Sequence, residues 1–296
     1  KGIEVMIKQL NVGLRSLIDK SAIRGRISTY DLGFKLGPRI NAAGRLGRSS
    51  FGTELLTATK TDDADRIADE LDKFNQERRT IESYVLDSAD KQVNEEKLNK
   101  KLLVVYGEDW HEGVIGIIAS RLKDKYHRPC VVITVSKGKA KGSGRSIKGI
   151  DLGNLVIAAK QAGIIDSGGG HSMAAGLSLK ENKIEKLSDF FESQISNNQS
   201  KVTDEKMIYV DSLISSSGIN LEVYDEIEKL GPFGSDNYEP NFVVKSSMLA
   251  SVNQIGEDHL KCLIKTPEGS FIEAMAFRSL STPLGDEIQR NKGNLV

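Results

Sequence analysis

The sequence predicts an α/β protein of about two domains, with a long helix and a smaller all-β region. Its 296 residues are more than one hydrophobic core usually organises. Apolar strands alternate with helices from about residue 100 to 200, which is typical of an α/β domain. Beyond residue 207 the pattern changes to short strands with glycine-containing turns at Gly256 and Gly269, which favours a small β-barrel.

The first sixty residues have a mixed helix and loop pattern. Apolar residues follow helical spacing over residues 6–18, and a glycine-rich segment follows at residues 33–52. The longest periodic segment covers residues 61–93 and has three aspartates near its start, where a helix favours acids. A helix of that length spans ~50 Å, so we expect it to connect two domains.

The remaining elements follow from periodicity and turn residues. We expect helices at 113–122, 151–161 (with Asp151 as the cap) and 182–195, and a polar linker at 196–204. We expect strands at 102–106, 130–135, 207–213, 242–252, 259–264 and 271–277.

Composition excludes several classes of protein. The 41 basic residues balance 41 acidic ones, which excludes a uniformly basic DNA-coating protein but leaves local basic patches open. No apolar run approaches the ~20 residues of a membrane span. The two cysteines, Cys130 and Cys262, form no metal-ligand pair and fit a reducing cytoplasm. Because the chain opens at Lys1 without an apolar leader, we expect a piece of a longer protein.

Two segments carry basic residues without acids. Residues 37–48 combine three arginines with Asn41 and three glycines, so Arg39 and Arg45 are candidates for phosphate contact. Helix capping or surface ion pairing would explain the same arginines. Residues 137–148 hold five basic residues, including Arg145 beside Ser146, and such a local excess of charge attracts a polyanion. A solvated hairpin tip would have a similar sequence.

Two further segments place a histidine beside glycines. Gly168, Gly169 and Gly170 precede His171 and leave backbone N–H groups for an anion, but the Gly-Lys-Ser/Thr ending of a phosphate-binding loop is missing. His111 follows a predicted strand and opens a helix, which is where α/β sheets often bind ligands. No second histidine completes a zinc motif, and we predict no metal site.

Together these motifs resemble the RecJ family of single-strand-specific 5′→3′ DNA exonucleases, within the DHH phosphoesterase superfamily. The string from Pro38 to Leu46 points to RecJ, whereas the triple glycine with His171 is similar to the superfamily-wide DHH-associated domain. The segments 110–116, 143–146 and 230–234 also stand where RecJ has them. The resemblance implies the end of a DHH domain (1–58), a connector helix (59–97), a DHH-associated domain (98–200) and a truncated oligonucleotide-binding (OB) domain (201–296).

The resemblance also implies roles for individual residues. Arg145 and Ser146 would hold the 5′-terminal phosphate, while His171 and the three glycines would contact the nucleotide beside the scissile bond. Arg39, Asn41 and Arg45 would line the path of the strand, with His111 near the metal cleft. His171 would be a catalytic residue, and His111 would support it. Stacking of bases in the OB domain would involve Phe233, Tyr238 and Phe242.

Two departures limit what the resemblance implies. The catalytic aspartates and the Asp-His-His motif of the family have no match here, so the Mn²⁺ or Mg²⁺ that activates water would not be held by this chain. The segment 234–240 also differs from the family pattern.

The resemblance further implies a cytoplasmic protein of DNA repair and recombination. Its partners would be single-stranded DNA, a single-strand-binding protein and a RecQ-type helicase. The alternatives are a DHH-family phosphodiesterase for nanoRNA or cyclic dinucleotides, and a non-catalytic DNA-binding scaffold.

Overall fold

The computed structural model describes residues 2–8, 10–25, 27–197, 209–234 and 236–296. The chain divides into two compact units, Lys1–Asp204 and Glu205–Val296, which are described separately. The predicted linker at 196–204 lies mostly outside the described residues.

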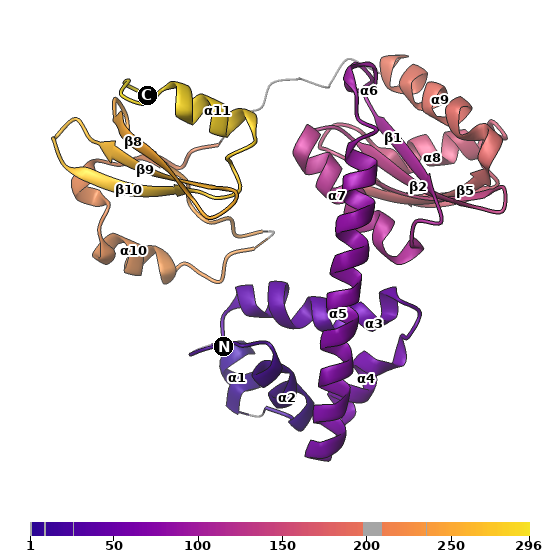
Figure 1. Ribbon diagram of the computed structural model, residues 1–296, viewed down its shortest axis with the longest axis horizontal. Helices are drawn as coiled ribbons and strands as arrows, with labels where there is room; N and C mark the ends of the chain where they lie inside the picture. The colour runs from indigo at the N-terminus through magenta and orange to yellow at the C-terminus, as the bar shows by residue number, and fades with distance from the viewer. Residues whose placement is uncertain (1, 9, 26, 198–208, 235) are drawn as a thin grey trace. The chain divides into compact units, whose positions relative to one another are not determined.

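The first unit begins with a group of helices packed around the lower half of a long one (Figure 1). These helices are α1 (Gly2–Lys8), α2 (Val12–Lys20), the π-helical η1 (Asp31–Leu36), α3 (Gly37–Arg45) and α4 (Ser50–Thr57). The prediction of a single helix at 6–18 was wrong, because this segment contains parts of two helices, α1 and α2. Asn11 accepts a hydrogen bond from the backbone N–H of Leu14 (2.7 Å) and starts α2 as its N-cap. The glycine-rich segment is largely helical.

The long helix α5 (Thr61–Asp90) confirms the predicted connector. Near its start Ile67, Ala68 and Leu71 pack in a core with residues of α2, α3 and α4. Near its end Val85 and Ala89 join a second core, which belongs to the following sheet. One helix therefore contributes to two of the three hydrophobic cores found among the described residues of this unit.

A five-stranded sheet forms the rest of this unit, in the order β1-β2-β3-β5-β4. The strands β1 and β2 are parallel and the other neighbours are antiparallel. A short helix, α6 (Glu95–Leu98), and a 3₁₀ turn, η2 (Glu181–Lys183), connect the larger elements. The strands are β1 (Leu103–Glu108), β2 (Cys130–Ser136), β3 (Lys139–Arg145), β4 (Ser167–His171) and β5 (Ala174–Lys180).

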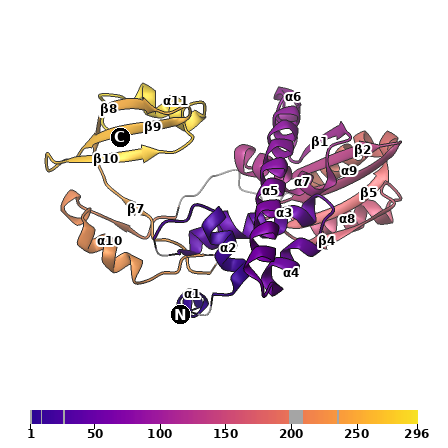
Figure 2. The same ribbon diagram turned by 60° about the horizontal axis from the view of Figure 1, so that its bottom comes forward.

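Helices cover both faces of this sheet (Figure 2). The helix α7 (Glu112–Tyr126) packs with α5 against one face, in the core that contains Trp110 and Ile118. The helices α8 (Leu152–Gln161) and α9 (Ile184–Asn197) pack on the other, around Phe191. Asp151 caps α8 as predicted, since its carboxylate accepts from the Asn154 amide at 2.9 Å.

The second unit contains a three-stranded antiparallel sheet in the order β10-β9-β8. Its strands are β8 (Met248–Ile255), β9 (His259–Lys265) and β10 (Phe271–Ala276), and α11 (Pro283–Arg290) follows them. A two-stranded parallel sheet joins β6 (Ser212–Leu213) to β7 (Phe242–Val243), with η3 (Ser216–Gly218) and α10 (Leu221–Glu228) between them in the chain.

One sequence expectation for this unit needs correction. The strand predicted at 242–252 is two strands, because Ser246 has a left-handed backbone (φ 51°) that breaks the extended conformation. Over the described residues the sheets do not close into a single barrel. The first residues of the strand predicted at 207–213 lie outside the described part of the chain.

No helix among the described residues is both long and apolar enough to cross a membrane.

Candidate functional site

The basic hairpin formed by β2 and β3 has two different faces. Successive side chains of a strand point to opposite sides of the sheet. Ala140, Gly142 and Gly144 face the core below α8, where a Cβ on Gly144 would lie 2.6 Å from Leu152. The alternate residues Lys139, Lys141, Ser143 and Arg145 therefore share the opposite face, on which α7 packs.

Strand register brings Arg145 and His171 into one row across that face. Arg145 pairs with Ala174 on β5, and Ala174 pairs with His171 on β4. Directly paired residues project from the same side of a sheet, so the two side chains flank a single alanine. Their backbones are two strand spacings apart, about 10 Å.

The neighbouring row of this face has almost no side chains. Ser143 pairs with Gly176, which pairs with Gly169, and a Cβ on Gly169 would meet nothing within 4 Å. The opposite side of β4 is closely packed, since a Cβ on Gly170 would lie 2.3 Å from the carbonyl oxygen of Ala174. The triple glycine is thus a strand of the sheet, and only its middle glycine lies on the open face.

The N-terminus of α7 reaches this site through two close contacts. His111 is the N-cap residue, and its Nδ1 accepts a hydrogen bond from the Gly113 amide at 3.1 Å. Gly113 lies against α3, because a Cβ there would be 2.0 Å from the carbonyl oxygen of Arg45. In return Nη1 of Arg45 donates to the Gly113 carbonyl at 3.0 Å.

The end of α3, the start of α7 and the strand β3 line an open cleft of about 740 Å³. Arg145 lies beside α7, and a Cβ on Gly116 would be 3.2 Å from its Nη2. The cleft is lined by Gly44, Arg45, Leu46, Gly47, His111, Glu112, Gly113, Gly116, Ser143 and Arg145. Its acid, Glu112, pairs with Lys141 at 2.8 Å, so two guanidinium groups remain to attract an anion.

Helix geometry separates the three predicted residues of α3. Asn41 and Arg45 are four residues apart and share one exposed face of the helix. Arg39 lies on the other side, where its Nε donates to Asp72 of α5 at 2.8 Å and its Nη1 donates to the Lys35 carbonyl at 3.0 Å. The contact with Asp72 joins α3 to α5, and the contact with Lys35 joins it to η1.

Ser146 does not line the cleft, and three further predicted residues belong to the second unit. Ser146 is 1% exposed, and its hydroxyl donates to the Ile150 carbonyl at 2.7 Å, which shapes the turn before α8. Phe233 is half-buried and belongs to the second unit, where Tyr238 is 79% exposed and Phe242 40% exposed.

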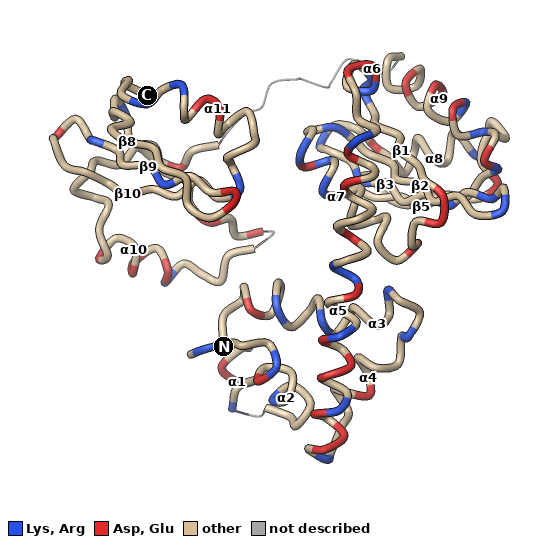
Figure 3. The backbone as a smooth tube through the Cα atoms, viewed as in Figure 1, with Lys and Arg blue, Asp and Glu red and all other residues tan. Residues whose placement is uncertain are grey.

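Sequence reasoning missed a buried charge cluster beside the cleft. Glu82 of α5 is 3% exposed and forms ion pairs with Arg78 of the same helix and Arg121 of α7. Burial lowers the pKa of Arg78, and repulsion from nearby Arg45 contributes in the same direction. The i,i+4 spacing of Arg78 and Glu82 is common on exposed helices, so the sequence gives no sign of this burial. Lys, Arg, Asp and Glu are mixed all along α5 (Figure 3).

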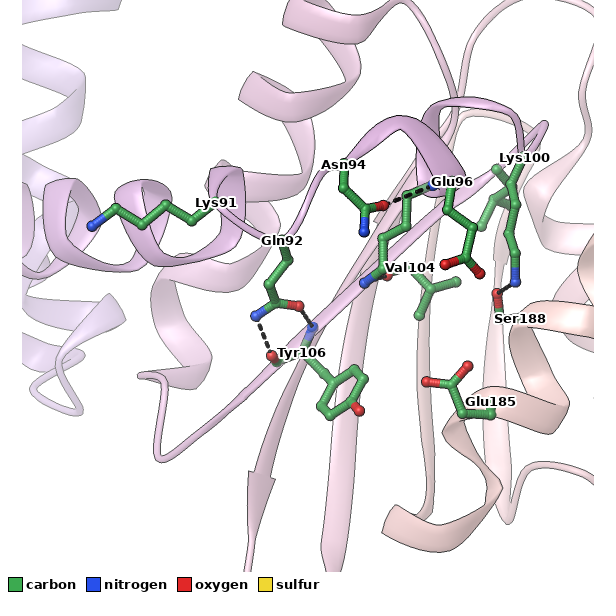
Figure 4. A pocket seen from close by; sticks show the side chains of 11 residues that line it. Lys91, Gln92, Asn94, Glu96, Lys100, Val104, Tyr106, Glu185 and Ser188 are labelled. Atoms are coloured by element: carbon green, nitrogen blue, oxygen red, sulfur yellow. Dashed lines mark hydrogen bonds between the residues drawn. The ribbon is translucent and has the colours of Figure 1, made fainter.

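A second cavity, of about 520 Å³, lies at the β1 edge of the sheet (Figure 4). The amide of Gln92 donates to the Tyr106 carbonyl (2.6 Å) and accepts from the Tyr106 N–H (3.1 Å). Lys97 donates to the Val104 carbonyl at 3.0 Å, and burial lowers the pKa of its ammonium group. These contacts provide hydrogen-bond partners for backbone groups on the outer edge of β1. None of the predicted site residues lines this cavity.

Among the described residues, no group of three or more His, Cys, Asp or Glu side chains could hold a metal ion. Two of the three charged side chains that line the cleft are arginines, which suits phosphate oxygens and does not fit a divalent cation.

Two family models match the chain, one within each of its two compact units. Residues 99–197 match the DHHA1 domain and residues 210–293 match the RecJ OB domain. These matches define a DHHA1 domain followed by an OB domain.

Whole-chain similarity identifies the family. The single-stranded-DNA-specific exonuclease RecJ of Haemophilus influenzae is 35% identical over 92% of this chain, and that of Bacillus subtilis is 33% identical over 93%. The crystal structure of RecJ with Mg²⁺ from Thermus thermophilus covers 94% of the chain with a TM-score of 0.79 and 26% identity. The chain belongs to the RecJ family. It spans 48% and 35% of the two sequence relatives and 42% of that crystallised chain.

Proposed function

We propose that this chain is the strand-binding part of an exonuclease that degrades single-stranded DNA from its 5′ end. The observation that carries the proposal is the convergence of Arg45 and Arg145 in one cleft. Guanidinium groups bind phosphate oxygens through paired hydrogen bonds, and low local negative charge strengthens that binding. The names of the relatives, which specify single-stranded DNA, and the OB domain support the same substrate.

In this proposal each part of the site has a separate task. Arg145 holds the 5′-terminal phosphate, and Arg45 together with Asn41 contacts the strand as it passes α3. His171 contacts the nucleotide that lies over the open face, because Gly169 and Gly176 leave the sheet backbone accessible there.

The proposal assigns strand binding to this chain and no hydrolytic step. RecJ structures from Thermus thermophilus contain Mg²⁺ or Mn²⁺, and such an ion supplies the activated water in metal-assisted phosphoryl transfer. The described residues offer no ligand set for it. On the family resemblance we further propose a cytoplasmic role in DNA repair and recombination. We also propose, on the same resemblance, that a single-strand-binding protein and a RecQ-type helicase are partners of the protein.

A binding experiment tests the proposal. Fluorescence anisotropy would compare 5′-phosphorylated with 5′-hydroxyl oligonucleotides at two salt concentrations. We expect tighter binding of the phosphorylated strand, and weaker binding of both as salt increases. Arg145→Ala should weaken binding of the phosphorylated strand about tenfold, since it removes a charged hydrogen-bond pair.

Arg290→Ala is the matched control, because Arg290 is an exposed arginine of α11, paired with Glu287. It should bind both strands as the unmodified chain does. An equal loss on both strands for Arg145→Ala would contradict end recognition by this residue. Absence of any DNA binding by the unmodified chain would contradict the proposed function.

Among the alternatives, the RecJ OB domain match at 210–293 favours the RecJ assignment over a phosphodiesterase for nanoRNA or cyclic dinucleotides. A non-catalytic scaffold would bind DNA in the same way. The full gene that encodes this chain would distinguish the nuclease from the scaffold, because only the nuclease would also encode the family's metal-ligand residues.

A further inference from the structure

The protonation of His111 follows from its place at the start of α7. Its Nδ1 accepts the Gly113 N–H at 3.1 Å, and a ring nitrogen can accept only when it carries no proton. The imidazole is then neutral, and its single N–H is at Nε2. That nitrogen has a proton to donate and no lone pair with which to bind a metal or remove a proton.

The amides of the same helix end are already engaged. The Gly113 N–H is held by His111, and the Val114 N–H donates to the His111 carbonyl at 3.0 Å. An anion in the cleft therefore cannot use these two amides. The imidazole extends the positive end of the 15-residue helix into the cleft through its Nε2–H.

We propose that His111 binds the substrate strand as a neutral hydrogen-bond donor, from Nε2–H to a phosphate oxygen held in the cleft with Arg45 and Arg145. In this role His111 is neither a general base nor a metal ligand. The inference rests on the proposed function, because it takes a phosphodiester strand as the anion.

Two substitutions separate the helix cap from the donor. In His111→Asn the side-chain oxygen can replace Nδ1 as the cap acceptor, but nothing replaces Nε2–H. In His111→Gln the longer side chain can carry an N–H to the position of Nε2, but the cap is lost. The readouts are the midpoint of thermal unfolding and the affinity for a 5′-phosphorylated oligonucleotide.

We expect opposite patterns for the two variants. His111→Asn should keep the unfolding midpoint and lose affinity about tenfold or more, the effect of one hydrogen bond to a charged group. His111→Gln should lower the midpoint while its affinity stays within about twofold of the unmodified chain. Unchanged affinity in His111→Asn would overturn the proposal.

A matched histidine provides the control. His259 of the second unit has the same arrangement, since its Nδ1 accepts from the Arg278 amide at 2.8 Å. His259→Asn should leave DNA affinity unchanged. Nitrogen-15 spectra of the imidazole groups should show the proton of His111 on Nε2, and a proton on Nδ1 would overturn the proposal. If the unmodified chain binds no DNA, the proposed function fails, whereas the spectra still test the His111 assignment.

Discussion

Arg39 and Arg45 show how two arginines of one motif acquire different tasks. Both stand in the string that resembles RecJ, and both were expected along the path of the strand. Because six residues separate them on α3, they point in different directions, so Arg39 pairs with Asp72 while Arg45 lines the cleft. The residue type predicted anion binding, but helix packing decided which guanidinium group is available.

The two alanine variants should therefore behave differently. Arg39→Ala should lower the free energy of unfolding by about 1 kcal/mol, as expected for a partly buried ion pair, and change DNA affinity little. Arg45→Ala should reduce DNA affinity about fivefold or more at low salt. Chemical denaturation and anisotropy measure the two effects. A large loss of DNA affinity in Arg39→Ala, without loss of stability, would contradict the structural role assigned to Arg39.

At the scale of secondary structure, the long helix and the α/β alternation followed from the sequence because their periodicity is local. Errors occurred where a single residue changes the backbone. Asn11 begins a new helix and Ser246 interrupts a strand, and neither residue alters the apolar pattern around it. The triple glycine was expected to expose its amides, and it forms an edge strand that pairs with β5 on one side only.

The outer edge of β1 gives a prediction at this scale. β1 has only β2 as a neighbour, and an open edge invites pairing with another chain. Gln92 and Lys97 occupy the backbone groups of Tyr106 and Val104 along this edge. We expect the double variant Gln92→Ala with Lys97→Ala to self-associate, as measured by sedimentation velocity.

The control for this variant is Lys73→Ala with Gln76→Ala on α5. The same residue types are removed there, but Lys73 and Gln76 bond to the side chains of Glu70 and Asp72. This pair should leave the chain in its original oligomeric state. Equal association by both double variants would show that lost charge, and not the open edge, is the cause.

At the scale of the whole molecule, charge is divided unequally between the two units. Residues 1–204 contain 33 Lys and Arg against 27 Asp and Glu, whereas residues 205–296 contain 8 against 14. The balanced total therefore conceals a basic unit and an acidic one. Since polyanion binding depends on local charge, the first unit should supply most of the salt-sensitive affinity.

A chain limited to residues 1–204 tests this expectation. We expect it to keep the preference for a 5′-phosphorylated strand and most of the salt dependence, because the cleft and its arginines belong to this unit. Anisotropy against the full chain measures both quantities, and circular dichroism checks that the shorter chain is folded. Loss of the end preference in a folded 1–204 chain would place part of the recognition in the second unit.

The sequence by itself determined the succession of elements, the family resemblance and the residue types able to bind phosphate. These depend on periodicities and motifs that extend over only a few neighbours in the chain. The tertiary structure decided which of those residues meet. Arg145 and His171 share a row because of strand register, while Arg45 reaches the start of α7 because Gly113 lets α7 approach α3. Such contacts join positions 26 to 68 residues apart, and no local pattern encodes that distance.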